Sequence, residues 1–171
     1  MEYFDVYNQA GEKLNKKVPR GQTLAKDEYY KVVHLWIKNK HNQYLIQQRN
    51  KSTDRHPYQW APTAGAVQAG ETPLQAVVRE AKEEIDLDIE SSQLHHVKTW
   101  IQSNHMGNII LDVYYLETDI SLENLSLDLN EVRQVKYASL KDIEEMTKVR
   151  QFWNYKLIDQ NYYQTLESVK K

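Results

Sequence analysis

The sequence predicts a single α+β domain in which a mixed, mostly antiparallel sheet packs against helices. Residues 29–38 (YYKVVHLWIK) are rich in β-branched and aromatic side chains, which is typical of a buried strand. Residues 73–85 (PLQAVVREAKEEI) instead repeat apolar residues at helical spacing. Neither an internal repeat nor a low-complexity linker divides the 171 residues, so we expect one domain over 1–171 with helices covering the sheet.

Strands are expected on both sides of this central helix. Residues 2–8 alternate like a strand and turn back at 8–11, so residues 1–28 are expected to form an N-terminal hairpin extension. A loop with Pro57 and Pro62 is expected to lead to Gly65. The other expected strands are 12–18, 29–38, 43–49, 95–102, 109–117 and 131–138, with turns at 39–42 and near Gly107.

The helix at 73–85 has the clearest start. Thr72 can cap it, Pro73 takes the first helical position, and Gln75 completes a capping box. Helical geometry places one apolar stripe toward the core, made of Leu74, Val77, Val78, Ala81 and Ile85. Two further helices are expected at 139–147 and 150–168, the second within a C-terminal helical segment 148–171.

The composition of the chain excludes some classes of function and argues against others. The net charge is −2 and no basic stripe stands out, which argues against a nucleic-acid polymer as partner. The absence of cysteine excludes disulfides, thiolate metal sites and a cysteine nucleophile. No signal-peptide pattern and no apolar run of ~18 residues is found, so the expected location is cytoplasmic, with no membrane association.

Three glutamates on the central helix are the candidate cation-binding residues. Glu80, Glu83 and Glu84 stand at i, i+3 and i+4, where like charges cost a helix about 0.2–0.5 kcal/mol per pair. Their clustering beside the core face indicates a bound cation, and oxygen ligands without His or Cys favour magnesium, manganese or calcium over zinc. The competing interpretation is a solvated helix face whose acids pair with Arg79 and Lys82.

The spacing from residue 65 to residue 87 resembles the Nudix box, G-x5-E-x7-R-E-U-x-E-E-x-G-U, where U is apolar. The matching residues are Gly65, Glu71, Arg79, Glu80, Ala81, Glu83, Glu84 and Leu87. Asp86 replaces the last glycine, and we expect it to adopt the left-handed conformation at a cost of about 1 kcal/mol. Flanking segments extend the resemblance over residues 29–147 and imply the α/β/α Nudix sandwich.

The resemblance implies Mg²⁺-dependent hydrolysis of a small-molecule diphosphate, with Mn²⁺ as a substitute. Glu83 and Glu84 are the first expected metal ligands, Glu80 is a third ligand or the base near the water, and the Gly65 carbonyl completes the site. A further acid from a later loop is expected, with Glu131 as first candidate and Glu117 as second. An ordinary surface charge is the competing interpretation for both.

Arginines have a supporting role in this hypothesis. Arg79 is expected to orient a glutamate, either Glu83 or Glu71, and Glu71 is expected to be structural. Arg49 and Arg55 are candidates for phosphate contacts, because the guanidinium fork matches phosphate oxygens, with surface roles equally open. Packing rather than ligand binding is expected for His34, Trp100 and Tyr114, and His56 is a weak ligand candidate.

Two other functions share this resemblance. The isopentenyl-diphosphate isomerases use a cysteine and a nearby histidine, but residues 63–67 (TAGAV) contain neither. A non-catalytic diphosphate sensor would not need the full set of glutamates. The N-terminal hairpin (2–18) and the helix at 150–168 are candidate contacts of a homodimer, with core packing as the competing interpretation.

Overall fold

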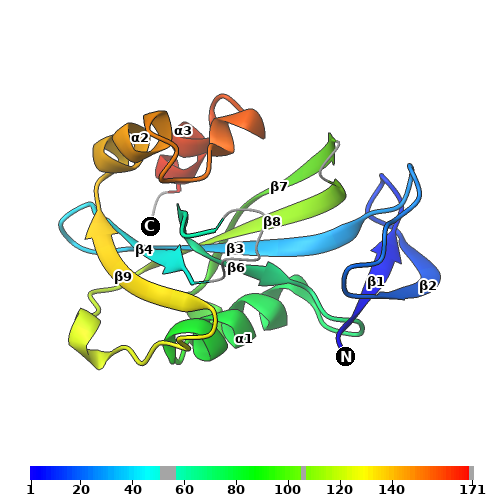
Figure 1. The fold of residues 1–171 in the computed structure, drawn as a ribbon, viewed down its shortest axis with the longest axis horizontal. Coiled ribbons are helices and arrows are strands. Elements are labelled where there is room, and N and C mark those ends of the chain that lie inside the picture. The colour runs from blue at the N-terminus through cyan, green and yellow to red at the C-terminus, as the bar shows by residue number, and fades with distance from the viewer. Residues whose placement is uncertain (51–56, 105–106, 170–171) are drawn as a thin grey trace.

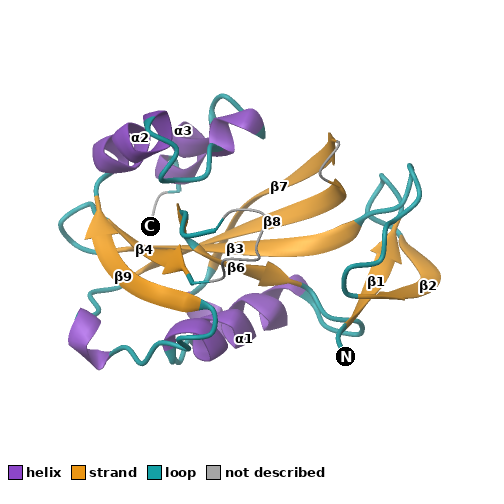
Figure 2. Cartoon of the chain, viewed as in Figure 1, coloured by secondary structure: helices purple, strands orange, loops and turns teal. Residues whose placement is uncertain are grey.

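The computed structural model describes residues 1–50, 57–104 and 107–169 and forms an α/β/α sandwich (Figures 1 and 2). The sheet is the middle layer. Helix α1 (Pro73–Ile85) lies against one face, and α2 (Leu140–Lys148) and α3 (Tyr162–Glu167) cover the other. This arrangement confirms the predicted α+β class. Within the described ranges, no helix has the length and apolar character needed to span a membrane.

The main sheet is mixed, as expected. Its central strand β3 (Tyr30–Lys38) runs parallel to β8 (Gly107–Glu117), and the other strand pairs are antiparallel. The order is β5-β4-β3-β8-β7, with β6 beside β3 and β9 beside β4. The remaining strands are β4 (Tyr44–Arg49), β5 (Trp60–Ala61), β6 (Thr63–Ala66), β7 (His95–Asn104) and β9 (Val132–Ala138).

Side chains of β3 alternate between two cores. Trp36 is fully buried on the side of α2 and α3, where it packs among Tyr155, Tyr162 and other aromatic residues. Val33 and Leu35 point to the opposite face and pack against α1. This period of two is the reason that the strand reads as continuously apolar, because both of its faces are covered.

Helix α1 begins and ends as its sequence predicts. The Thr72 side chain accepts a hydrogen bond from the Gln75 amide, and the Gln75 side chain reciprocates, which completes the capping box. Asp86 ends the helix with φ 55° and ψ 37°, which confirms the expected left-handed residue. Val77, Ala81 and the other members of the predicted stripe face the sheet.

The expected N-terminal hairpin is present as β1 (Tyr3–Tyr7) and β2 (Lys13–Pro19). It packs against the loop that leads into α1. Asp5 is 3% exposed, and its Oδ2 accepts hydrogen bonds from the Gly70 amide at 2.7 Å and the Lys13 ammonium at 2.7 Å. The Tyr3 carbonyl accepts a further bond from the Ala69 amide at 2.8 Å. The hairpin therefore holds the loop between β6 and α1.

Two expectations were wrong. The predicted helix at 150–168, within the C-terminal segment 148–171, is broken: a 3-10 turn at Tyr155–Leu157 and the short α3 replace it. Asn154 and Asp159 accept hydrogen bonds from nearby backbone amides, which competes with helix formation. The loop expected before Gly65 is also wrong, because it contains the short strands β5 and β6 on either side of Pro62.

Candidate functional site

Arg79 is the centre of the candidate site. Its Nε and Nη2 donate to the two Glu71 oxygens at 2.9 and 3.0 Å, and Nη2 also donates to the Ala66 carbonyl at 3.0 Å. Its Nη1 donates to Glu80 Oε1 at 2.7 Å and to Glu83 Oε2 at 2.9 Å. Both contacts that the sequence left open, with Glu71 and with Glu83, are made. One guanidinium therefore sets the positions of three carboxylates.

Gly65 lies directly under Glu80. It pairs with Val33 in the sheet, which turns its Cα toward α1. A Cβ placed on residue 65 would overlap the Glu80 carboxylate, so this position accepts only glycine while Glu80 keeps its place. The close approach also places the backbone of β6 beside the glutamates of the helix, as the expected role of the Gly65 carbonyl requires.

Glu84, unlike Glu83, is buried inside the protein. It is 6% exposed, and its Oε2 accepts a hydrogen bond from Gln47 Nε2 at 2.7 Å. Burial raises the pKa of Glu84 to about 8, the Gln47 hydrogen bond opposes this rise, and the charges of Glu80 and Glu131 add to it. Glu84 is therefore an acid whose charge the metal-free fold does not fully stabilise.

Backbone contacts bring Glu131 to the same place. The Asp128 amide donates to the Glu84 carbonyl at 3.1 Å, and the Glu131 amide donates to the Asp128 carbonyl at 2.9 Å. This segment is thereby tied to α1. Burial raises the pKa of Glu80, and the charge of Glu131 raises it further, so the two carboxylates interact. Glu117, the second candidate, instead accepts a hydrogen bond from the Tyr115 hydroxyl.

The carboxylates fit a hard divalent cation in chemistry, although they do not yet converge. Among the described residues, no three His, Asp or Glu side chains are grouped closely enough to hold a metal; Arg79 binds Glu80 and Glu83, and Gln47 binds Glu84. The pKa of Glu80 and of Glu84 is raised by burial and by neighbouring acids, which is a local excess of negative charge that a cation would neutralise. Oxygen donors alone suit Mg²⁺ or Mn²⁺.

The two candidate phosphate ligands differ in what the structure says of them. Arg49 ends β4, and its positive charge opposes the rise in the pKa of Glu84 and of Tyr155 that burial causes. Arg55 lies outside the described residues, as does His56.

The remaining candidates pack in the interior, as expected. His34 is 7% exposed, and its Nδ1 lies 3.3 Å from the Tyr162 hydroxyl, which also accepts a hydrogen bond from Trp36 at 2.9 Å. Trp100 is buried and stacks on Tyr162 with ring centroids 4.9 Å apart. Tyr114 is buried in the core beside α1. None of these side chains belongs to the glutamate cluster, by which we mean Glu80, Glu83, Glu84 and Glu131.

Sequence reasoning missed the partners of Glu84. Gln47 and Thr63 are both buried, and the Thr63 hydroxyl donates to Gln47 Oε1 at 3.1 Å. One signal was available: Gln47 lies two residues after Leu45, on the inward face of a strand whose neighbours are apolar. A polar residue on such a face needs a hydrogen-bonding partner.

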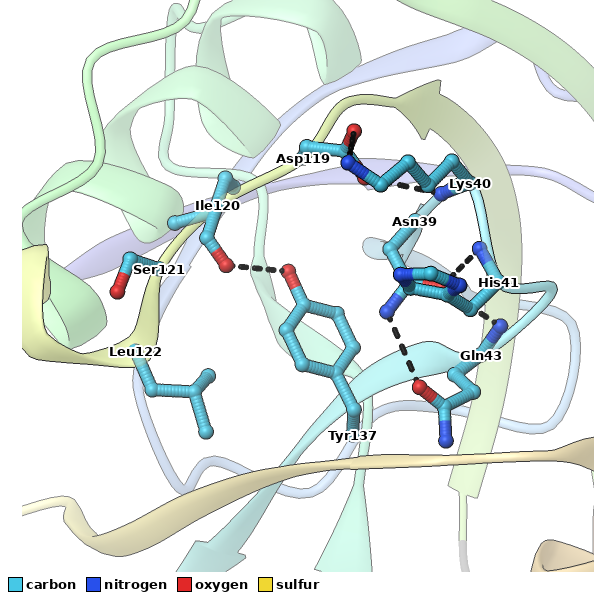
Figure 3. Close-up of a pocket in the computed structure, with 9 residues that line it drawn as sticks. All are labelled: Asn39, Lys40, His41, Gln43, Asp119, Ile120, Ser121, Leu122 and Tyr137. Atoms are coloured by element: carbon cyan, nitrogen blue, oxygen red, sulfur yellow. Dashed lines mark hydrogen bonds and ion pairs between the residues drawn. The ribbon is translucent and has the colours of Figure 1, made fainter.

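A hollow of about 400 Å³ lies apart from this site, at the turn between β3 and β4 (Figure 3). The side chains around it bind one another. Asn39 Oδ1 accepts from the His41 and Gln43 amides at 3.0 Å each, and the Tyr137 hydroxyl donates to the Ile120 carbonyl at 2.9 Å. These contacts stabilise the turn and the loop after β8.

The chain is similar to known proteins in sequence and in fold. The NUDIX domain model matches residues 29–160. A Nudix hydrolase of Listeria innocua is 32% identical, with 94% of this chain and 93% of the relative covered. The fold is similar to the crystal structure of DR0079 from Deinococcus radiodurans, with a TM-score of 0.76, 21% identity and coverage of 94% and 99%.

A second solved structure is the NUDIX domain of Shewanella oneidensis NrtR in complex with ADP ribose. It has a TM-score of 0.63 and 17% identity, and the alignment covers 86% of this chain and 92% of that domain. At this identity the likeness is one of fold. The domain match and the Listeria relative together show more, because each spans most of the chain. The chain belongs to the Nudix family and is a pyrophosphohydrolase of the general class that cleaves nucleoside diphosphate-linked compounds.

Proposed function

We propose that this chain uses Mg²⁺ to hydrolyse the phosphoanhydride bond of a small nucleoside diphosphate-X compound or another diphosphate-X compound. The observation that carries the proposal is the pairing of Arg79 with Glu71, Glu80 and Glu83 above the buried Glu84. Such an arrangement concentrates several acids in a fixed geometry around one arginine, which compensates only part of their charge. A diphosphate that carries its own negative charge requires a cation in the same place.

The residues proposed to hold the ion are Glu80, Glu83 and Glu84 on α1, the Gly65 carbonyl on β6, and Glu131 on the loop before β9. Mn²⁺ would occupy the same ligands. When bound, the ion supplies charge neutralisation for the diphosphate and lowers the pKa of a nearby water. Arg79 and Glu71 act earlier, because they hold the helix carboxylates in register before substrate arrives.

In the proposed reaction, the oxygen of a water attacks one phosphorus of the diphosphate. The bond from that phosphorus to the bridging oxygen breaks, and the leaving phosphate keeps the bonding electrons. A carboxylate of the glutamate cluster takes the proton from the water. Arg49, whose charge reaches the cluster, contacts a phosphate oxygen, and Arg55 is proposed for the same task.

The test is phosphate release from a panel of diphosphate-linked metabolites in the presence of magnesium. ADP-ribose belongs in the panel because the related NrtR domain binds it; nucleoside triphosphates, dinucleotide polyphosphates, coenzyme A and prenyl diphosphates complete it. Each reaction is run with and without added pyrophosphatase, so that released pyrophosphate is also detected. We expect turnover by the wild type and its loss in Glu83→Gln.

The same panel separates the competing functions. A sensor would bind a panel compound in calorimetry and release no phosphate. An isomerase would interconvert allylic and homoallylic diphosphates without phosphate release, although residues 63–67 offer no cysteine for it. Either result would refute the hydrolase proposal.

A further inference from the structure

Gln47 and Thr63 meet across a gap in the sheet. Strands β3 and β4 pair only at Ile37–Leu45 and Lys38–Tyr44 and then diverge. Beyond that point β6 continues beside β3, and β5 and β9 flank β4. Thr63 on β6 and Gln47 on β4 face each other across this divergence, and Glu84 reaches them from α1.

Three side chains form a directed row of hydrogen bonds there. The Thr63 hydroxyl donates to Gln47 Oε1 at 3.1 Å, and Gln47 Nε2 donates to Glu84 Oε2 at 2.7 Å. All three residues are between 3% and 6% exposed. An ionised carboxylate only accepts hydrogen bonds, so the amide nitrogen faces Glu84, and a reversed amide would place two oxygens against each other; the Thr63 hydroxyl holds the amide oxygen on the other side.

The neutral charge of Gln47 matters as much as its position. Arg79 orients Glu80 and Glu83 with a cationic group, which also offsets part of their charge. Gln47 orients Glu84 with a neutral amide, which adds no positive charge beside the carboxyl group. Of the two carboxyl oxygens of Glu84, Oε2 is held by Gln47 at 2.7 Å.

We propose that Gln47, held by Thr63, is a positioning residue that fixes the Glu84 carboxylate for divalent metal binding. The inference rests on the proposed function only in placing the metal at Glu84. It adds a requirement that the helix motif does not contain: the strands β4 and β6 must supply the amide and the hydroxyl. Partners that orient metal ligands typically contribute a factor of about 10–100 to metal affinity.

The experiment measures Mn²⁺ binding to the full chain by calorimetry, without substrate. We expect Gln47→Leu to weaken binding by about 10-fold or more and Thr63→Val to weaken it by a smaller factor, while Thr63→Ser restores it. Thr63→Val should add nothing in the Gln47→Leu background, because both act through one amide. Gln48→Leu is the matched control, since Gln48 donates to the Tyr58 carbonyl and not to Glu84.

Each outcome decides the proposal. Unchanged Mn²⁺ affinity in Gln47→Leu would overturn it, as would equal affinity in Thr63→Val and Thr63→Ser. Thermal unfolding without metal checks that each variant folds; if Gln47→Leu does not fold, the Thr63 pair gives the answer alone. Wild-type protein that binds Mn²⁺ but cleaves no panel compound would refute the proposed hydrolysis and leave this measurement intact. Wild-type protein that binds no Mn²⁺ would overturn the positioning role.

Discussion

Arg79 and Glu71 form a two-pronged ion pair, with Nε and Nη2 of the arginine at 2.9 and 3.0 Å from the two glutamate oxygens. The planar guanidinium is thereby fixed in rotation as well as in position. Its remaining nitrogen, Nη1, is then directed at Glu80 and Glu83. Glu71 therefore acts through Arg79 on the glutamates that are proposed to bind the metal.

Arg79→Lys is expected to lower kcat by about 100-fold, because one ammonium cannot reproduce the fork and the glutamates lose their alignment. The measurement is steady-state kinetics on the substrate that the panel identifies. Lys82→Ala on the same helix is the control, since Lys82 pairs with the exposed Asp86 and Asp88. A fully active Arg79→Lys enzyme would contradict the role of the fork.

Gly65→Ala is expected to abolish most activity while the protein stays folded. The added methyl group would displace the Glu80 carboxylate, which is the flexible end of its side chain, rather than the backbone of α1. Circular dichroism and thermal unfolding report the fold, and phosphate release reports the site. Gly21→Ala in the loop after β2, whose φ of 89° strains alanine although an added Cβ meets no neighbour, shows what a destabilising glycine substitution away from the glutamates does to activity. Wild-type turnover by Gly65→Ala would show that activity does not depend on the observed position of the Glu80 carboxylate.

Glu84→Gln is expected to stabilise the metal-free protein as it removes activity. The folded-state pKa of Glu84, about 8 through burial, lies above its ordinary value, so the charged form is disfavoured by folding. Wild-type stability is therefore highest below the ordinary pKa and falls as the pH rises toward 8. Urea unfolding in the presence of a chelator should show the variant more stable than the wild type by about 4 kcal/mol at pH 8 and equally stable near pH 4.5. A less stable variant at pH 8 would contradict this assignment.

His34 should make the protein sensitive to acid. Burial lowers its pKa to about 3, so the folded state keeps the imidazole neutral while the unfolded state takes up a proton below pH 6.5. Stability is complete above pH 6.5 and is lost at up to about 1.4 kcal/mol per pH unit as the pH falls toward 3. Urea unfolding between pH 7 and 5 should give a shallower slope for His34→Gln. His96→Gln, at a half-exposed histidine, is the comparison; equal slopes in His34→Gln and wild type would refute the prediction.

Asp86→Gly should stabilise the protein. A glycine relieves a left-handed strain of about 1 kcal/mol. The loss of the exposed Lys82–Asp86 ion pair costs about 0.3–0.5 kcal/mol and offsets part of this gain. We expect a net gain of about 0.5 kcal/mol by urea unfolding. Asp86→Ala should be destabilising, since alanine tolerates this conformation less well. A loss of stability in Asp86→Gly would mean that the ion pair outweighs the strain.

Local patterns predicted the parts of the site that lie close together in sequence. The caps of α1, its apolar stripe and the Arg79–Glu83 contact all depend on helical spacing within a few residues. Resemblance to the Nudix box added the expected role of Gly65, which no periodicity reveals. The structure places Gly65 under Glu80.

Contacts that depend on tertiary folding were not predictable in this way. Gln47 and Glu84 are 37 residues apart, and nothing in either segment alone specifies their meeting. Strand β6 is four residues long, too short for a clear alternation, and it exists because β3 pairs with it. The segment at 150–168 has aromatic residues at helical spacing, yet Tyr155 and Tyr162 stack on each other across a turn instead.

The parallel pairing of β3 with β8 has a consequence for how the chain folds. Parallel strands cannot be joined by a tight turn, and here Tyr30 pairs with Ile109, so the connection between them includes β4, β6 and the whole of α1. Closing such a long loop costs more chain entropy than forming a hairpin and is slower. The ribosome must therefore synthesise β8 before the sheet that packs against α1 can be completed. Helix α1, which carries the proposed metal ligands, is synthesised before β8, and the sheet against which it packs is completed only at this late, non-local step.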